Sequence, residues 1–195
     1  MFLDEGLQKT DGLFVIPRLH MKLGKSRDGF FGSWFCSENG LVYLGRLVAI
    51  AWAYDYRAER HYSNHVTVSH DNGWTWSAPI DTGHMGQASN LMWLGGDHLL
   101  SIHAHRGEES GIYVRLVDFT GDRWRMVEET VIYGAGAAQQ SRPGQSMPRM
   151  FVSLRFGQPS LVRLGNGEIL ATHWAIEEGQ GRIRTHRLRL QGETA

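Results

Sequence analysis

The chain has 195 residues, with 20 basic and 20 acidic side chains and a formal net charge of zero. This balance excludes the strong positive field with which proteins attract nucleic acid or anionic membranes, so we expect neither as a partner. The single cysteine, Cys36, excludes an internal disulfide and a zinc site built from several thiolates. The sequence holds no stretch long enough for a membrane-spanning helix, and residues 1–13 lack the apolar run of a secretory signal, which leaves the compartment open.

The residue pattern is typical of an all-β domain. Glycine is abundant, with 24 residues, and short apolar runs recur between turn-forming residues without helical periodicity. In chain order, strands are predicted at residues 13–25, 41–44, 46–52, 64–68, 74–76, 88–94, 98–105 and 111–119. The stretch 134–148 is rich in Gly, Ala, Gln, Ser and Pro, which predicts a long exposed loop.

Three turns that end in tryptophan recur along the chain. Trp34, Trp76 and Trp124 are 42 and 48 residues apart, which is the length of a four-stranded propeller blade. The period predicts one propeller-like domain over residues 1–195. Its blades are expected at about 13–35 (partial), 38–80, 85–133 and 150–190 (partial).

A second alignment gives the same period from another part of the blade. The sequence Gly86-Gln87-Ala88-Ser89 resembles Gly157-Gln158-Pro159-Ser160. Two further pairs fall in register, His103 with His173 and Gly111 with Gly181. The repeat therefore extends through the last blade.

The stretch from Ser69 to Trp76 has the chemistry of a reverse turn, since Asp71 can bond nearby backbone N–H groups and Gly73 tolerates a positive φ. Its pattern, Ser-x-Asp-x-Gly-x-Thr-Trp, resembles the Asp box of sialidases (neuraminidases) and related bacterial-neuraminidase-repeat (BNR) β-propellers. The turn of Trp34 is a degenerate copy, and that of Trp124 lacks the Ser and Asp. The resemblance implies an all-β, six-bladed propeller, of which this chain matches about three blades of the C-terminal half. It implies a structural role in the turn for Ser69, Asp71, Gly73, Thr75 and Trp76.

An incomplete propeller would leave sheet edges unpaired and apolar surface uncovered. We therefore expect the chain to be part of a longer protein, or to associate with a second copy through the unclosed edges.

Blade topology assigns polar residues to one of two rims. The Asp boxes mark one rim; loops between the second and third strands, and connections between blades, share the other, where sialidases bind their ligand. The resemblance thus gives substrate-binding candidates on this ligand rim: Arg57, His103, His105, Arg106, Arg155, His173 and Trp174. The histidines suit a metal, but no carboxylate or thiolate spacing supports one, so we expect no metal and no cofactor.

Sialidases hold a substrate carboxylate with three arginines and use a Tyr activated by a Glu as nucleophile, with an Asp as acid/base. Arg106 and Arg155 are the best-placed arginines for a carboxylate. No Tyr matches the nucleophile: Tyr54, Tyr56, Tyr113 and Tyr133 all lack the family context. Asp55 or Glu108 can serve as a general acid only if burial or a neighbouring charge raises its pKa.

Two functions follow from these residues. The first is an exo-acting, sialidase-like glycoside hydrolase, or the C-terminal half of one, whose substrate is an acidic or neutral glycan that carries sialic acid or another sugar. The second is a non-catalytic propeller that binds a glycan or a protein, because fold alone does not confer activity. A third interpretation is a structural fragment without a function of its own.

Overall fold

The computed structural model describes residues 40–55, 60–107, 109–134 and 154–190. The predicted partial blade at 13–35, most of the predicted loop 134–148, and the candidates Arg57 and Glu108 lie outside these residues. Of the two compact units into which the chain divides, residues 31–195 form the one that contains all the described elements. No helix among the described residues has the length and apolar character needed to cross a membrane.

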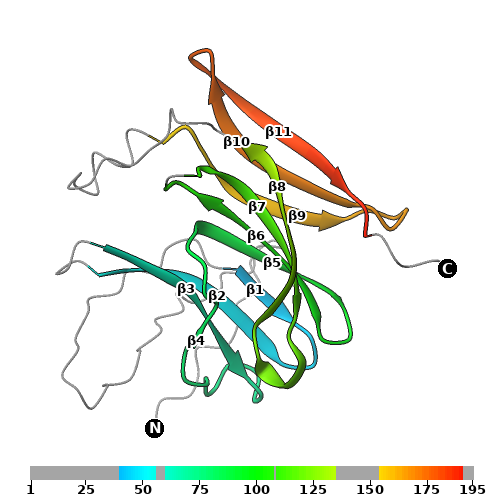
Figure 1. The fold of residues 1–195 in the computed structure, drawn as a ribbon. Coiled ribbons are helices and arrows are strands. Elements are labelled where there is room, and N and C mark those ends of the chain that lie inside the picture. Colours follow the sequence, from blue (N-terminus) through cyan, green and yellow to red (C-terminus); the bar gives the residue numbers. More distant parts are fainter. Residues whose placement is uncertain (1–39, 56–59, 108, 135–153, 191–195) are drawn as a thin grey trace, which may run out of the picture. The chain divides into compact units, whose positions relative to one another are not determined.

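The described residues form three antiparallel sheets (Figure 1). The first sheet contains, in order, β1 (Gly40–Tyr43), β2 (Leu47–Asp55), β3 (Arg60–Ser69) and β4 (Ile80–Asp81). The central sheet contains β5 (Gln87–Gly95), β6 (His98–His105), β7 (Gly111–Asp118) and β8 (Arg125–Gly134). The third sheet has the order β11-β10-β9, with β9 (Phe156–Arg163), β10 (Ile169–Glu177) and β11 (Gln180–Leu188).

The sheets succeed one another as propeller blades do. The first strand of each sheet contacts the first strand of the next, β1 with β5 and β5 with β9. The sheets span residues 40–81, 87–134 and 156–188, where the sequence predicted blades at 38–80, 85–133 and 150–190. The predicted fold class, all-β with the arrangement of a partial propeller, is confirmed.

Two apolar clusters pack on the two faces of the central sheet. Because strand residues alternate between faces, Leu99 of β6 packs toward the first sheet, while Leu100 and Ile102 pack toward the third. The cluster next to the first sheet contains Leu44, Val48, Ile50, Val66, Val68, Leu91, Leu99, Val117 and Phe119. The cluster next to the third sheet contains Leu100, Ile102, Ala104, Ile112, Val114, Phe156, Ile169, Ala171 and Ala175.

The turn from Ser69 to Trp76 is tied together by its own side chains. The Asp71 carboxylate accepts hydrogen bonds from the Thr75 N–H at 2.8 Å and the Thr75 hydroxyl at 2.6 Å, and Ser69 Oγ accepts one from the Gly73 N–H at 2.8 Å. The Trp76 indole donates to the Gly73 carbonyl at 3.2 Å. These bonds lower the pKa of Asp71 to about 2, the largest contribution coming from the Thr75 hydroxyl.

The prediction that residues 74–76 form the returning strand is wrong. The strand that pairs with β3 is β4, where Ile80 lies opposite Val66. The intervening Ser77 donates its backbone N–H to the Val68 carbonyl at 2.8 Å, but its hydroxyl accepts the bond from the Val68 N–H at 3.1 Å. A side chain thus replaces a ladder bond, and regular pairing begins only beyond Ser77.

The turn that precedes Trp124 lies at the same rim as the turn of Trp76. His70 Nε2 lies 2.7 Å from a carboxylate oxygen of Asp122, and Arg46 forms ion pairs with both Asp97 at 3.0 Å and Asp122 at 2.6 Å. Trp34 lies outside the described residues. The described loops that contain Arg46, His70, Asp97 and Asp122 therefore define one rim, called the turn rim below.

The predicted register of Gly111 with Gly181 is off by one residue. Gly111 pairs with His105, and the residue that corresponds to His105 in the last repeat, Ala175, pairs with Arg182. The reason is the tight hairpin between β10 and β11, whose two loop residues, Glu178 and Gly179, both have positive φ values of 51° and 77°.

Candidate ligand rim and buried polar cluster

The rim opposite the turns, called the ligand rim, gathers aromatic, histidine and arginine side chains where β2, β3, β6 and β7 end or begin. The Trp52 and His61 rings lie 5.8 Å apart. The His105 and Tyr113 rings also lie 5.8 Å apart and are nearly perpendicular, at 85°. The His105 Nδ1 donates to the Met85 carbonyl at 3.2 Å, which fixes the ring across the connection between the first and central sheets.

His61 is partly exposed and is held in its neutral form. Burial lowers its pKa most, and the charge of Arg106 and the neighbouring His105 lower it further. His61 therefore lies within electrostatic range of Arg106 and His105. A neutral imidazole can both donate and accept a hydrogen bond, which suits it to a sugar hydroxyl group.

The predicted substrate-binding residue Arg106 is buried, with 4% of its surface exposed. Its Nε and Nη2 atoms each donate to the Phe156 carbonyl oxygen at 3.4 Å. A Cβ atom added at Gly157 would lie 2.2 Å from Nη2, so any side chain there would push the guanidinium aside. Arg106 therefore joins the central sheet to the third sheet, a role that its position in the sequence does not reveal.

A cluster of buried polar side chains occupies the face of the central sheet toward the first sheet. We call it the polar cluster; it consists of His84, Ser101, His103 and Arg115. His103 is fully buried and stacks on His84, with ring centroids 5.6 Å apart. The Arg115 guanidinium donates to His103 from a distance of 2.6 Å and forms an ion pair with Glu129 of β8 at 2.5 Å.

The polar cluster keeps its histidines uncharged. Burial first, and the positive charge of Arg115 second, lower the pKa of His84 to about 4 and hold that of His103 well below its ordinary value. Gly86 lies directly against His103, since an added Cβ would come within 2.0 Å of the ring. Both rings can therefore accept hydrogen bonds at neutral pH.

Several buried polar atoms of this region have no hydrogen-bond partner among the described residues. They are His84 Nε2, Gln87 Oε1, Ser101 Oγ, Arg115 Nε and Trp124 Nε1. Asn64, which is fully buried, is satisfied: its Nδ2 donates to Ser89 Oγ at 2.9 Å and its Oδ1 accepts from the Gly86 N–H at 3.0 Å. Sequence reasoning missed Asn64, His84 and Arg115. The alternation of polar residues at 101, 103 and 105 in a buried strand was the available signal.

His173, which the repeat aligned with His103, is also buried, with 2% of its surface exposed. Its Nδ1 donates to the Trp174 carbonyl at 3.1 Å, and its Nε2 lies 3.1 Å from Nε2 of His186. The two rings are stacked, with centroids 5.3 Å apart and planes 8° apart. Burial lowers the pKa of both rings, so the pair is uncharged at neutral pH.

A tyrosine and a glutamate meet at the ligand-rim ends of β8 and β10. The Tyr133 hydroxyl donates to Glu177 Oε1 at 3.3 Å, and the Tyr133 ring lies 4.6 Å from that of His173. Arg184 also donates to Glu177, and it is the largest cause of the lowered pKa of Glu177. Burial and the Glu177 charge raise the pKa of Tyr133. These two residues could not be paired from the sequence alone, because 44 positions separate them.

The remaining predicted site residues are placed as follows. Arg155 is exposed, and its carbonyl accepts a bond from the Ile176 N–H at 2.6 Å. Trp174 is half-buried on β10. The backbone of Asp55 ends β2 opposite Arg60. The structure thus brings His61, His105 and Arg106 together on one part of the ligand rim, and Tyr133, His173 and Glu177 on another.

A scan of protein-family models finds no match for the chain, and a search of curated proteins finds none either. Solved structures share its fold. A Bacteroides ovatus protein named xyloglucan PUL GH43B superposes with a TM-score of 0.52 and 11% identity over 80% of this chain and 27% of that one. A protein of unknown function from Dyadobacter fermentans superposes with a TM-score of 0.54 and 17% identity over 79% of this chain and 38% of that one.

A third structure, a xylan β-1,4-xylosidase from Bacillus halodurans, gives a TM-score of 0.42 with 13% identity over 83% of this chain and 42% of that one. The chain thus spans less than half the length of each of these proteins. At such identities the likeness shows the fold, which is one that GH43 β-propeller glycoside hydrolases have. A specific likeness to sialidases is not among these matches.

Proposed function

We propose that the chain forms part of a β-propeller glycoside hydrolase of the sialidase type and binds its glycan on the ligand rim. The observation that carries this proposal is the contact between Tyr133 and Glu177, because a Tyr–Glu pair is the nucleophile arrangement that the Asp-box resemblance implies. The fold shared with a GH43 protein supports a glycosidase in general. The intact Ser69–Trp76 turn supports the sialidase type in particular.

The surroundings of the pair suit an acidic sugar. Arg182 and Arg184 flank Glu177, and the exposed Arg155 lies one strand away through its bond to Ile176. Guanidinium groups bind a carboxylate through two parallel hydrogen bonds. The half-buried Trp174 offers an apolar surface to the sugar ring, and the neutral His61 offers hydrogen bonds to its hydroxyl groups. Asp55 and Glu108 stay the candidates for the acid.

The experiment is to measure release of a fluorescent aglycone from aryl glycosides of sialic acid and of xylose by the 195-residue chain. Tyr133→Phe should abolish hydrolysis while binding of the sugar, followed by saturation-transfer NMR, persists. Tyr113→Phe is the matched control, because the Tyr113 hydroxyl donates only to a backbone carbonyl, that of Glu109 at 2.7 Å. Equal hydrolysis by Tyr133→Phe and the unmodified chain would contradict the assignment. Unchanged turnover in Arg106→Ala and Arg155→Ala would remove those two arginines from it.

A second function, non-catalytic glycan binding, is favoured by the ionisation of the same pair. The raised pKa of Tyr133 opposes formation of a phenolate, and Glu177 is engaged by Arg184. Arg106 is likewise engaged by the Phe156 carbonyl. In this case sugar binding is observed without hydrolysis of any aryl glycoside, and His105→Ala weakens it.

A further inference from the structure

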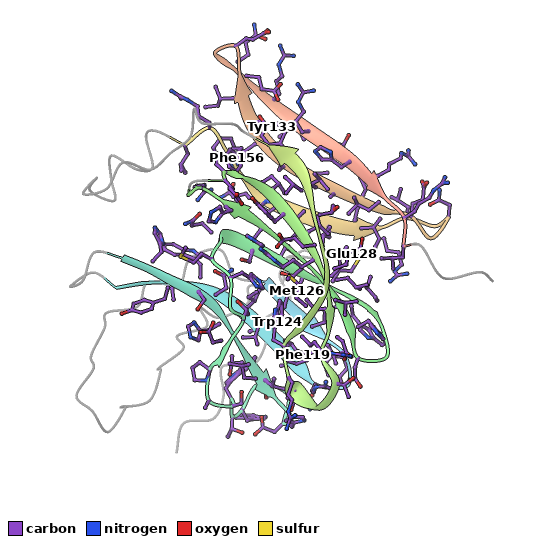
Figure 2. The ribbon with its side chains drawn as sticks, in the orientation of Figure 1. Phe119, Trp124, Met126, Glu128, Tyr133 and Phe156 are labelled. Atoms are coloured by element: carbon purple, nitrogen blue, oxygen red, sulfur yellow. The ribbon has the colours of Figure 1, made fainter. Side chains whose placement is uncertain are left out.

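The turn from Ser69 to Trp76 contains an Asn–Gly pair that neither proposed function uses. Asn72 and Gly73 have positive φ values of 58° and 93°, as the central residues of a type I′ turn do. Asn72 is exposed, and its side-chain amide has no hydrogen bond among the described residues. The pair lies on the turn rim, where the neighbouring turn leads to Trp124 (Figure 2).

Asn–Gly pairs are prone to deamidation, because glycine has no side chain to shield its backbone nitrogen. The Gly73 nitrogen would give its proton to hydroxide, bond to Cγ of Asn72 and displace the side-chain nitrogen as ammonia. The product is a cyclic imide, which water opens at either carbonyl to give aspartate or isoaspartate. Water and its hydroxide are the only co-reactants, and an exposed turn has access to both.

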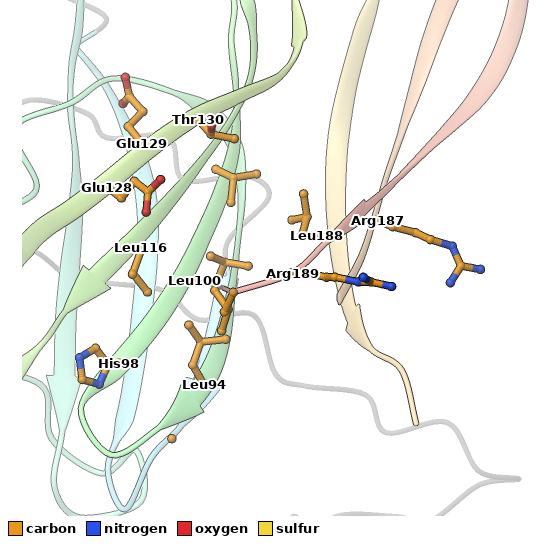
Figure 3. A pocket seen from close by; sticks show the side chains of 13 residues that line it. Leu94, His98, Leu100, Leu116, Glu128, Glu129, Thr130, Arg187, Leu188 and Arg189 are labelled. Carbon is orange, nitrogen blue, oxygen red and sulfur yellow. The ribbon is translucent and has the colours of Figure 1, made fainter. Parts of the chain in front are cut away.

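A second Asn–Gly pair of the described residues, Asn166–Gly167, lies between β9 and β10. Asn166 is also exposed, but Glu168 holds its amide at both ends: Nδ2 donates to Oε2 at 2.9 Å, and Oδ1 accepts from the backbone N–H at 3.1 Å. Glu168 is fixed in turn by Arg187 and Arg189, which line a pocket of about 610 Å³ (Figure 3). The Asn166 amide must therefore break two hydrogen bonds before it can reorient.

The glycine nitrogens of the two pairs are alike, because both are hydrogen-bonded. The Gly73 N–H donates to Ser69 Oγ at 2.8 Å, and the Gly167 N–H donates to the Leu164 carbonyl at 3.0 Å. Each bond stabilises the protonated nitrogen and so slows its attack. The asparagine side chains are therefore what distinguishes the two pairs.

From this difference we infer that Asn72 is a site of spontaneous deamidation in the folded chain, whereas Asn166 is protected. The Ser69 hydroxyl limits the rate at Asn72 through its bond to the Gly73 N–H. Isoaspartate inserts a methylene group into the backbone before Gly73. It thus displaces the residue whose N–H bonds Ser69 and whose carbonyl accepts the Trp76 indole, so the reaction loosens the turn.

The experiment is to incubate the 195-residue chain at mildly alkaline pH and to quantify deamidated peptides by mass spectrometry, with electron-transfer fragmentation to identify isoaspartate. In the folded chain Asn72 should react at least about fivefold faster than Asn166, the rate ratio that one hydrogen bond represents. In urea the two should react at similar rates, because glycine follows both. An equal or faster reaction of Asn166 in the folded chain overturns the inference. So does an unreacted Asn72 after a time in which the unfolded chain is converted.

Two serine variants test the restraint on the Gly73 nitrogen. Ser69→Ala frees the Gly73 N–H and should raise the rate at Asn72 about fivefold. Ser77→Ala is the matched control, because it removes a hydroxyl of the same hairpin that accepts from the Val68 N–H instead. It should leave the rate at Asn72 unchanged. An equal rise in both variants, or no rise in Ser69→Ala, would overturn the role of the Ser69 hydroxyl.

Discussion

The two faces of the central sheet differ although the same strands form both. On β6, Leu100, Ile102 and Ala104 face the third sheet and pack in an apolar cluster, whereas Ser101 and His103 face the first sheet and join the polar cluster. The apolar face holds the sheets together by burial. The polar face holds buried groups with unused hydrogen-bonding capacity, an arrangement that costs stability and is tolerated where function requires it.

The largest expected effect tests the apolar face. Ile102→Ala removes a fully buried side chain and should lower the free energy of unfolding by about 3 kcal/mol, as cavities in apolar cores do. Ser101→Ala, the neighbour on the polar face, should change it by less than about 1 kcal/mol, because its hydroxyl has no partner among the described residues. Urea denaturation measures both. Equal losses would mean that the faces do not differ.

A smaller loss is expected from the polar face when its charge pair is broken. Arg115→Met leaves Glu129 without its partner and should cost about 2 kcal/mol, less than for a fully buried pair because Glu129 is partly exposed. Adding Glu129→Gln should restore part of the loss. The matched control is Arg125→Met, which breaks the exposed pair with Asp118 on the same two strands and should cost less. If the double variant is no more stable than Arg115→Met, the charge is not the cause.

The buried histidines of the polar face should make the stability of the chain depend on pH. The unfolded chain protonates His84 near the ordinary pKa of 6.5, but the folded chain does so only near pH 4. The contribution to stability is therefore complete above about pH 6.5 and is lost as the pH falls toward 4, amounting to about 3 kcal/mol. His103 and His61 act in the same direction. Denaturation midpoints from pH 8 to 4 should fall less steeply in His84→Gln, and an unchanged slope would contradict the burial of a neutral ring.

The smallest effect concerns the turn rim, where a carboxylate rather than a buried ring is involved. Asp71 has its pKa lowered to about 2 by hydrogen bonds from Thr75 and Ser69. Its contribution is present above about pH 4 and is lost as the pH falls toward 2, a window below that of the histidines. Asp71→Asn should reduce the loss of stability in this second window, to which Glu168, with its pKa also lowered to about 2, still contributes. It should leave the window between pH 6.5 and 4 intact. A change in the upper window would show that the two rims are coupled.

Much of the fold followed from local patterns. Apolar runs between glycine turns predicted strands at 41–44, 88–94, 98–105 and 111–119, close to β1, β5, β6 and β7. The strand that returns after the Ser69–Trp76 turn was predicted too early, because the Ser77 side chain replaces a ladder bond. The high strand propensity of Trp74, Thr75 and Trp76 does not reveal this replacement. The residues that pair within the site could not be predicted from the sequence. His84 contacts His103, and Tyr133 contacts Glu177, only because elements distant in sequence pack together.

The sequence by itself determined the alternation of β6, the chemistry of the Ser69–Trp76 turn and the repeat of four-stranded units, because each depends on residues within a few positions or on a fixed period. Only the tertiary structure decided that Arg106 is buried against Phe156 and that Arg115 links His103 to Glu129. It also decided that Trp124 packs against Phe119. The physical reason is that side chains on adjoining sheets meet according to pairing register, which a shift of one residue changes.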